Sequence, residues 1–514
     1  MSKTIIIIGA GLAGLSAALQ AAENGCNVKL VSSLPSERAQ SVMAEGGINA
    51  ALNTKDENDS PEEHFTDTIK AACGLADPNA VWGMTQAAPE LVHWLLKLGV
   101  QFNMSGYDDV DLRNFGGQKK KRTAFAQSDT GKQIMTAMID AVRRKEASGM
   151  VERFSHHSFL TLRLCGNICC GCVIRDEYSQ ETVELPGDAV IVATGGMHGL
   201  FGNTTGSLSN TGEVTAELFR LGVPLANGEM IQYHPTTVKC GGKRMLISEA
   251  ARGEGGRLFA MKDGKQWYFM EEKYPELGNL MPRDITAREI WKVSHESEVF
   301  LDMTEISDEI ISNKLSGLAD DCMTYLHKDI RKEPVSVLPG IHYFMGGILV
   351  DEQHRTPIQN LCAAGECCAQ YHGANRLGGN SLLGALYGGR VAAKSACEQA
   401  DVVDLSCATQ IDFPPASQIS EIKQLNKVMQ ETMGVVRNEN TLLNGIQTVQ
   451  ALTGNLPLLG MAVLKSALAR KESRGAHWRE DYPKSNDDDY LKTTVARFDG
   501  KQIQISFVPV PERR

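Results

Sequence analysis

Apolar stretches with the pattern of buried strands alternate with helical patterns in the first part of the chain. Four isoleucines in Thr4–Ile8 predict a buried strand, a helical pattern follows up to about Glu23, and residues 27–31 predict a second strand. Residues 151–186 are rich in strand patterns, and residues 189–196 predict a buried strand that ends in a glycine turn. Strands that alternate with helices indicate an α/β fold.

Helical patterns dominate two other parts of the chain. Between the early strands, apolar spacing predicts two helices. One contains Leu91, Trp94, Leu95 and Leu98, and the other covers residues 124–141. After Pro414-Pro415, three further patterns at residues 417–433, 438–452 and 458–471 predict a small helical bundle. A strand pattern follows near residues 502–508.

Length and charge limit the kinds of protein that the chain can be. A chain of 514 residues is too long for one hydrophobic core, so we expect roughly two to four domains. The formal net charge of −10 disfavours nucleic acid and anionic membranes as partners. Glycines interrupt the apolar N-terminal segment, and no other stretch has the length of a membrane span. We therefore expect a cytoplasmic protein without a membrane span of its own.

The cysteines do not predict a metal centre. Thirteen are present, and their odd number and spacing give no disulfide framework, which fits a reducing compartment. Cys169 and Cys172 have the spacing of metal ligands, but no second such pair completes a site with four ligands. We expect neither zinc nor an iron–sulfur cluster in this chain.

A glycine-rich turn follows the first predicted strand. Gly9, Gly11 and Gly14 stand between that strand and the helix, which is the context of a dinucleotide-binding site. The glycines permit a tight turn and close approach of the backbone to a pyrophosphate. Ser32 and Ser33 occupy the end of the second strand, where an acidic residue would bind the ribose of NAD. This substitution disfavours a standard NAD site.

Residues 361–390 combine several features of a ligand-binding site. Glu366 is followed by the run His372–Arg376, a glycine pair and a helix that we expect to open near Leu382. Asn380 and Ser381 are good N-cap residues, and a helix N-terminus suits an anion or a polarisable ring. Arg376 offers a planar fork of donors that fits a carboxylate.

Histidines, arginines and acidic residues gather in the motifs MIQYHPTT, LISEAARGEGG, MPRD and HYFMGG, between residues 230 and 347. Two histidines and three arginines are among them when Arg376 is included: His234, His342, Arg252, Arg283 and Arg376. Such a set suits the capture of a small dianion, because fork-shaped donors bind carboxylates and also stabilise developing charge.

These motifs together resemble the succinate dehydrogenase/fumarate reductase flavoprotein family, which also includes L-aspartate oxidase. The resemblance covers nearly the whole chain, including RKESRGAHWREDYP at residues 470–483. It implies a Rossmann-like FAD-binding domain with an inserted α+β capping domain and a small C-terminal helical domain. We place the two parts of the FAD-binding domain at residues 1–226 and 346–405, the capping domain at 227–345 and the C-terminal domain at 406–514.

The resemblance also implies which residues bind FAD. They are Gly9, Gly11, Gly14, Ser32, Ser33, Gln40, Ser41, Glu45, Gly46, Gly47, Thr194, Gly195, Gly196, Glu366, Asn380, Ser381 and Leu382. Many respiratory members carry, five residues before the glutamate of the second loop, a histidine that is bonded to the flavin. Gln40 stands there and cannot form that bond, so we expect FAD to be held non-covalently. We interpret the nearby His64 as a structural or surface residue.

The substrate site follows from the same resemblance. His234, Ser248, His342 and Arg376 match the residues that bind a dicarboxylate, and Arg283 matches the proton donor, with Glu249 and Arg252 as its relay. The implied reaction is hydride transfer from flavin N5 to fumarate with protonation by Arg283, or the reverse, and the non-covalent flavin favours reduction. Alternatives are L-aspartate oxidase, a reductase of another α,β-unsaturated acid, and a non-catalytic FAD-binding subunit.

The implied partners are a small dicarboxylate and a source of electrons. Since the chain has no cluster or haem motif of its own, a separate iron–sulfur subunit or a soluble donor must supply the electrons. We expect the protein in the cytoplasm, with membrane association only through partner subunits.

Overall fold

A five-stranded parallel sheet forms the centre of the computed structural model, which describes residues 2–106, 109–399, 413 and 419–514. Its strand order is β20-β10-β1-β2-β6, with bounds Leu361–Ala363, Ala189–Val192, Thr4–Ile8, Asn27–Ser32 and Val151–Ser155. The isoleucines of β1 are buried on both faces of the sheet, as their unbroken apolar run predicts. The predicted α/β class is confirmed.

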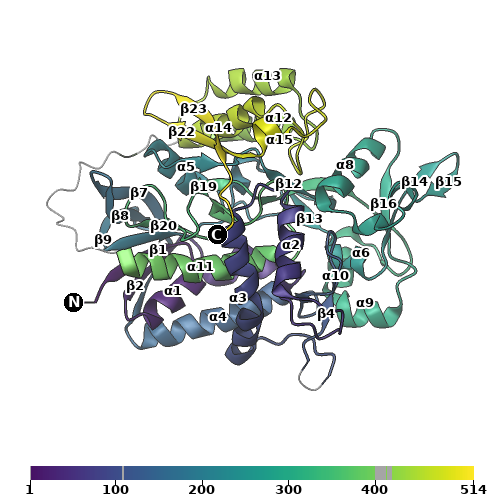
Figure 1. Cartoon of the computed structure of the whole chain (residues 1–514), viewed down its shortest axis with the longest axis horizontal. Coiled ribbons are helices and arrows are strands. Elements are labelled where there is room, and N and C mark those ends of the chain that lie inside the picture. The colour runs from purple at the N-terminus through teal and green to yellow at the C-terminus, as the bar shows by residue number, and fades with distance from the viewer. Residues whose placement is uncertain (1, 107–108, 400–412, 414–418) are drawn as a thin grey trace.

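Helices cover one face of this sheet (Figure 1). They are α1 Leu12–Glu23, α4 Thr130–Ala147 and α11 Asn380–Gln399, and α3 Pro78–Leu98 packs on α4 and α11, with α2 Pro61–Ala71 packed on α3. Apolar residues of α1, α3, α4 and α11 share one core with β1 and β2. Helix α1 is buried along nearly all of its length because it lies among the sheet, α4 and α11.

One predicted helix is displaced from its expected position. Residues 124–141 were expected to be helical, but Thr123–Ala124 forms strand β5, and α4 begins only at Thr130. Strand β5 pairs with β3 Ile48–Asn49 and β4 Leu112–Arg113. Pairing with distant segments overrides the local helical pattern at the start of this region.

Two smaller groups of strands flank the main sheet. The strand-rich region after β6 forms a three-stranded antiparallel sheet of β7 His157–Cys165, β8 Ile168–Asp176 and β9 Thr182–Pro186. A second sheet joins early and late parts of the chain in the order β21-β19-β11-β22-β23. Its strands are Cys368–Ala369, Gly347–Leu349, Leu225–Ala226, Lys492–Phe498 and Ile503–Pro509, and α5 Glu213–Arg220 packs nearby.

Residues between β11 and β19 build a separate lobe with its own core (Figure 1). It contains two sheets, β13-β12-β18 (Lys243–Leu246, Ile231–Cys240, Leu338–Phe344) and β15-β14-β16-β17 (Lys265–Trp267, Arg257–Lys262, Val299–Asp302, Val335–Ser336). Its helices are α6 Glu249–Gly253, α7 Phe269–Lys273, α8 Arg283–Val293, α9 Asp308–Lys314 and α10 Ser316–Asp321. This lobe corresponds to the predicted capping domain.

The predicted C-terminal helices are present as α12 Ile419–Thr432, α13 Glu439–Val449 and α14 Asn455–Ala469, with the short α15 Asp487–Tyr490. They share a core with residues of the main lobe, such as Leu200 and Phe201. The strand pattern near residues 502–508 corresponds to β23, which pairs with β22. Pro414-Pro415 and the predicted boundary at 405 lie outside the described residues, and the domain boundaries stay predictions.

The cysteine-rich stretch forms no metal site in the described part of the chain. Cys169, Cys170 and Cys172 are free and buried in β8, and no described group of His, Cys, Asp or Glu could hold a metal ion. Cys165 is disulfide-bonded, although the number and spacing of the cysteines give no disulfide framework. Among the described residues, no helix has both the length and the apolar character needed to cross a membrane.

Candidate active site

The glycine turn after β1 has the geometry that a dinucleotide needs. Gly9 has φ +111°, and a Cβ on Gly14 would lie 1.9 Å from the Gly9 carbonyl oxygen, so both positions require glycine. Gly11 is the N-cap of α1 and has no side chain to cap the helix, and of the amide groups at this end the Leu12 amide donates to the Ser41 hydroxyl. The other amide groups at this helix end are therefore available to an anion.

Polar groups without protein partners lie at the edges of this turn. At the end of β2, the Ser32 hydroxyl is buried and has no hydrogen-bond partner among the described residues, whereas Ser33 is exposed. In the second loop, the Ser41 hydroxyl accepts a hydrogen bond from the Leu12 amide at 3.2 Å, next to the partly buried Gln40. An unsatisfied buried hydroxyl beside a helix N-terminus fits the polar groups of a bound dinucleotide.

Glu45, Gly46 and Gly47 follow in this second loop. Gly47 has φ +133° and packs on the carbonyl of Ala124, and the Glu45 Oε2 atom is buried without a partner in the described structure. Burial, and then the charge of Asp321, raise the pKa of Glu45 to about 8. Glu45 is therefore largely neutral at neutral pH.

The glycine turn after β10 lies against Glu366. Gly195 has φ +74°, and a Cβ on Gly196 would come within 2.7 Å of the Glu366 Oε1 atom. Glu366 Oε1 accepts a hydrogen bond from the Phe344 amide at 3.1 Å. Thr194 is partly exposed at the start of the turn. The three glycine-lined segments thus leave polar groups for a ligand, and they fit FAD.

Asn380 does not have the free side chain that the sequence suggested. Helix α11 begins at Asn380 rather than near Leu382. The Asn380 amide oxygen contacts His64 Nε2 at 2.9 Å and accepts from Asn49 Nδ2 at 2.8 Å, and its Nδ2 donates to the Thr68 hydroxyl at 3.0 Å. Its predicted cofactor contact has no support from the side chain.

The residues near Asn380 differ in how far they are buried. His64 is fully buried, and burial lowers its pKa to about 3, so a surface position is wrong and its structural interpretation stays a prediction. Leu382 is buried in the main core, and Ser381 is partly exposed in the first turn of α11.

Arg283, Glu249 and Arg252 form a buried chain of charges in the capping lobe. Arg283, the first residue of α8, donates through Nε and Nη2 to Glu249 Oε2 at 2.8 and 2.5 Å. Glu249 Oε1 lies 3.5 Å from Arg252 Nη2 and accepts from the Gly116 amide at 3.0 Å. Arg252 Nη1 donates to the Asn279 carbonyl at 2.6 Å. The three predicted relay residues are thus adjacent.

The electrostatics of this chain keep Glu249 ionised. Burial would raise the pKa of Glu249, but the charges of Arg283 and Arg252 outweigh burial and the pKa is lowered. Burial lowers the pKa of Arg252, although the Glu249 charge opposes this effect. Glu249 is therefore a carboxylate that bridges two guanidinium groups.

Arg376 is a buried cation without an anionic partner in the described structure. Only 3% of it is exposed, its Nε atom makes no hydrogen bond to the described residues, and its guanidinium lies 4.3 Å from the ring centre of Tyr343. Burial, and then repulsion by Arg283, lower the pKa of Arg376 to about 9. An unpaired buried charge is costly, so this geometry favours an anionic ligand.

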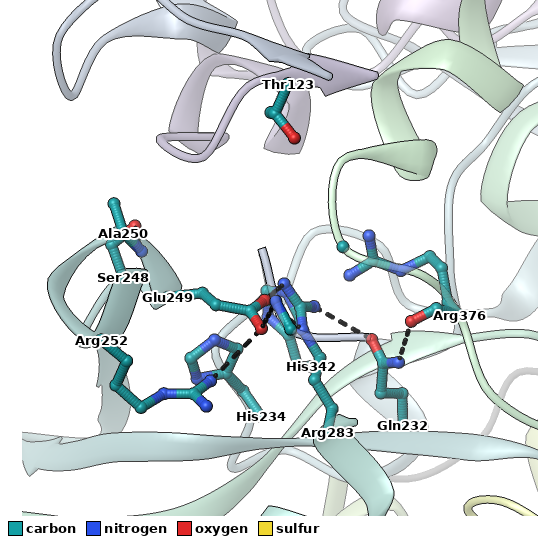
Figure 2. A network of polar contacts seen from close by, with 12 residues as sticks. Thr123, Gln232, His234, Ser248, Glu249, Ala250, Arg252, Arg283, His342 and Arg376 are labelled. Atoms are coloured by element: carbon teal, nitrogen blue, oxygen red, sulfur yellow. Dashed lines mark hydrogen bonds and ion pairs between the residues drawn. The ribbon is translucent and has the colours of Figure 1, made fainter. Parts of the chain in front are cut away.

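Gln232 connects the two arginines, and sequence analysis did not select it. Its Oε1 accepts from Arg283 Nη1 at 3.1 Å, and its Nε2 donates to the Arg376 carbonyl at 2.8 Å (Figure 2). It lies in β12 two positions before His234, and the pairing of β12 with β18 has a register shift between Gln232 and Tyr233. Simple strand alternation therefore did not predict its position.

His234 and His342 face each other with their ring centres 5.1 Å apart. Burial, and then the charge of Arg283, lower the pKa of both imidazoles well below the ordinary value. His342 Nδ1 lies 2.8 Å from the Thr205 hydroxyl. Ser248 caps α6, where its hydroxyl accepts a hydrogen bond from the Ala250 amide. The histidines are neutral groups, so they can donate hydrogen bonds but add no charge.

The predicted substrate residues therefore converge on one buried region (Figure 2). Arg252, Arg283 and Arg376 are positive and Glu249 is negative, which leaves these four side chains with a formal charge of +2. That charge matches a dicarboxylate dianion. Residues of the capping lobe and of the loop before α11 both contribute.

The flavin-type dinucleotide fold and this cationic region define a class, the FAD-dependent oxidoreductases. A profile described as "FAD binding domain" matches residues 4–382, and one described as "Fumarate reductase flavoprotein C-term" matches residues 452–513. The protein is an FAD-dependent oxidoreductase, and within that class the chain belongs to the succinate dehydrogenase/fumarate reductase flavoprotein family.

Proteins that are similar to this chain over its whole length support this assignment. The succinate dehydrogenase flavoprotein subunit of Bacillus subtilis is 38% identical over 100% of this chain and 98% of that protein. The 8-methylmenaquinol:fumarate reductase flavoprotein subunit of Wolinella succinogenes is 32% identical over 100% and 92%. The FrdA chain of E. coli quinol fumarate reductase superposes with a TM-score of 0.90 at 27% identity, covering 99% of this chain and 97% of that one.

Proposed function

We propose that the protein interconverts fumarate and succinate, with fumarate reduction as the favoured direction. The single observation that carries this proposal is Arg376, a buried guanidinium without an anionic partner in the described residues, in a region of formal charge +2. A small dianion would neutralise that charge. Bound FAD supplies the hydride-transfer chemistry, and the residues of this chain bind, orient and protonate the substrate.

Four side chains would hold the two carboxylates. Arg376 offers a bidentate fork to one carboxylate. His234, His342 and Ser248 donate hydrogen bonds, since both imidazoles are neutral. Donors on different sides of the substrate would fix its plane and polarise it, which eases addition to the alkene.

Arg283 would donate a proton to the substrate carbon. A free arginine does not lose its proton near neutrality, so this role requires prompt return of a proton. Glu249 accepts two hydrogen bonds from Arg283 and lies 3.5 Å from Arg252, which places a carrier between the two guanidinium groups. The lowered pKa of buried Arg252 makes its proton easier to give up. The relay would therefore run from Arg252 through Glu249 to Arg283.

FAD would be held non-covalently, because Gln40 occupies the position of the linking histidine and an amide cannot form that bond. In this family, the lack of a covalent link favours fumarate reduction. The relatives above are named as subunits, which supports electron supply by a separate protein. We propose either an iron–sulfur subunit or a soluble donor.

Steady-state kcat and directly titrated dissociation constants distinguish a proton donor from a clamp, by which we mean a residue that only binds a substrate carboxylate. Arg283→Lys and Glu249→Gln should lower kcat by about 10²–10⁴-fold, the usual worth of general acid catalysis, with little change in fumarate binding. Arg376→Lys keeps the charge but loses the fork, and should weaken fumarate binding by roughly 1–3 kcal/mol.

The reverse pattern would contradict the proposal. If Arg283→Lys loses fumarate binding while turnover at saturation stays near normal, Arg283 is a clamp and not an acid. If aspartate-dependent peroxide formation exceeds fumarate-dependent oxidation of a reduced dye in the unmodified protein, the activity is that of an amino-acid oxidase.

A further inference from the structure

His198 is a buried histidine between the cofactor and substrate regions that the mechanism above does not use. It opens the short helix η3 His198–Leu200, two residues after Gly196, and its side chain is 1% exposed. The Phe344 ring packs edge to face on the His198 ring, with ring centres 5.0 Å apart and an angle of 82° between the ring planes. A Cβ on Gly206 would lie 2.1 Å from the His198 Cε1 atom. The ring is therefore tightly fixed in position.

The contacts of Thr204 are compatible with one tautomer of the His198 ring. The Thr204 hydroxyl oxygen accepts from the Gly206 amide at 3.2 Å and lies 3.0 Å from His198 Nδ1. The hydroxyl has one hydrogen, and donating it to Nδ1 satisfies both groups. Nδ1 is then the acceptor of the neutral ring, and Nε2 carries the hydrogen.

The Nε2 atom of His198 faces Glu366. Nε2 lies 3.5 Å from Glu366 Oε1, and it is buried and makes no hydrogen bond in the described part of the chain. The same carboxylate oxygen accepts from the Phe344 amide. Two donors thus face one oxygen of Glu366, while the side chain of Glu366 stays 13% exposed.

We propose that His198 is a positioning residue for FAD, which acts by holding the carboxylate of Glu366. With Oε1 bonded by the Phe344 amide and His198 Nε2 placed beside it, Oε2 is left to accept a hydrogen bond from a hydroxyl group of the cofactor. This inference rests on FAD binding and on Glu366 as a cofactor residue, and it is independent of the dicarboxylate proposal.

Two substitutions of His198 distinguish the contributions of its two ring nitrogens. His198→Asn keeps a polar atom near the Nδ1 position and loses the donor toward Glu366. His198→Gln places an amide nitrogen near the Nε2 position and keeps that donor. A structural role alone would make the two variants similar, whereas a role through Glu366 makes His198→Gln the milder change.

The experiment measures FAD release from the holoenzyme on dilution, by the rise in free-flavin fluorescence and without substrate. We expect His198→Asn to raise the FAD dissociation constant roughly 10-fold or more, the scale of a lost hydrogen bond to a charged group. His198→Gln should stay within about 3-fold of the unmodified protein on the same scale. Glu366→Gln should weaken FAD binding, and His198→Asn combined with Glu366→Gln should add little to it.

Several results would overturn the proposal. They are an unchanged dissociation constant in His198→Asn or in Glu366→Gln, equal losses in His198→Asn and His198→Gln, or fully additive losses in the double variant. Should His198→Asn fail to fold, Glu366→Gln and His198→Gln still decide the matter, because the first must weaken FAD binding and the second must largely retain it. Since no substrate is present, failure of the fumarate proposal leaves these measurements unaffected.

Discussion

Single buried charges give this site its chemical character. Arg376 has no anionic partner among the described residues, whereas Arg283 is bound by Glu249 and Gln232. The two arginines are therefore suited to different roles. A guanidinium held by a carboxylate can exchange protons through it, and one left unpaired is free to bind a ligand.

Glu45 makes substrate binding depend on pH. Its pKa of about 8, raised first by burial, keeps it neutral at pH 7 and makes it an anion above pH 8, next to Ser248. A new negative charge in this region should oppose a dianion by on the order of 1 kcal/mol, about fivefold in Kd. We expect the Kd for fumarate to rise between pH 6.5 and 8.5.

Glu45→Gln provides the control, because glutamine stays neutral across that range. A titration of fumarate into the variant should show a nearly flat Kd. Measurements stop at pH 8.5 because Arg376, with a pKa of about 9, begins to lose charge above that value. An equal rise in both proteins would assign the pH dependence to another group.

Gln40 determines how the flavin is retained. Because its amide cannot bond covalently to the ring, acid precipitation should release all of the yellow colour into the supernatant. The measurement is the absorbance of supernatant and dissolved pellet, together with fluorescence of the band on a denaturing gel. Flavin that stays with the protein band would show a covalent link through another residue.

Helix α1 illustrates how one element serves both the core and the cofactor. Gly14→Ala would place a Cβ 1.9 Å from the Gly9 carbonyl, whereas a Cβ on Gly11 has no described protein atom nearer than 3.6 Å. Gly14→Ala should therefore destabilise the protein by roughly 1–3 kcal/mol through overpacking, in addition to losing FAD.

Gly11→Ala is the matched variant, since its added methyl group faces the space that the pyrophosphate approaches. We expect it to weaken FAD binding with little change in the melting temperature of the flavin-free protein. The two quantities to compare are that melting temperature and the FAD content after purification. A normal FAD content in Gly14→Ala would contradict the role given to this turn.

Strand β12 and helix α8 bring the capping lobe to the substrate. Gln232 and His234 both lie in β12, and Arg283 is the first residue of α8. Contacts between α8 and β12 fix the distance between these side chains. Any motion of this lobe relative to the loop of Arg376 would change the bonds of Gln232.

At the scale of the molecule, the last residues of the chain connect the C-terminal sheet to the FAD-binding lobe. Arg513 lies over the rings of Trp82 and Phe65, at 3.9 and 4.8 Å from their centres. Asn79 of α3 donates to the Glu512 carbonyl at 3.0 Å and accepts from the Arg514 amide at 2.9 Å. Figure 1 shows this end of the chain beside α3.

Removal of the Arg513 side chain should loosen this connection. Exposed cation–π contacts contribute about 0.5–1 kcal/mol each, so the loss of both in Arg513→Ala should lower the melting temperature by about 1–2 °C. Arg514→Ala is the control, because the Arg514 side chain is 83% exposed and its ion pair with Glu352 contributes little. Thermal unfolding followed by circular dichroism compares the two variants, and equal melting temperatures would contradict the expected role of Arg513.

Local patterns in the sequence by themselves determined the α/β class and the glycine turn of a dinucleotide-binding site, whereas FAD was implied by the family resemblance and the residues that bind it stay predictions. The isoleucine run of β1 and the spacing of Gly9, Gly11 and Gly14 act within a few residues, where steric rules and apolar periodicity decide the structure. The relay of Glu249, Arg252 and Arg283 was named from resemblance, and its members are adjacent in the structure, although their roles stay predictions.

Only the tertiary structure decided how distant groups meet. Residues 123–124 became a strand because they pair with β3, and the Asn380 side chain turned inward because His64, Asn49 and Thr68 bond it. Gln232 and His198 gained their significance from partners more than a hundred residues away in the chain. A buried polar group must find its hydrogen bonds wherever the fold provides them, so no local pattern specifies its partner.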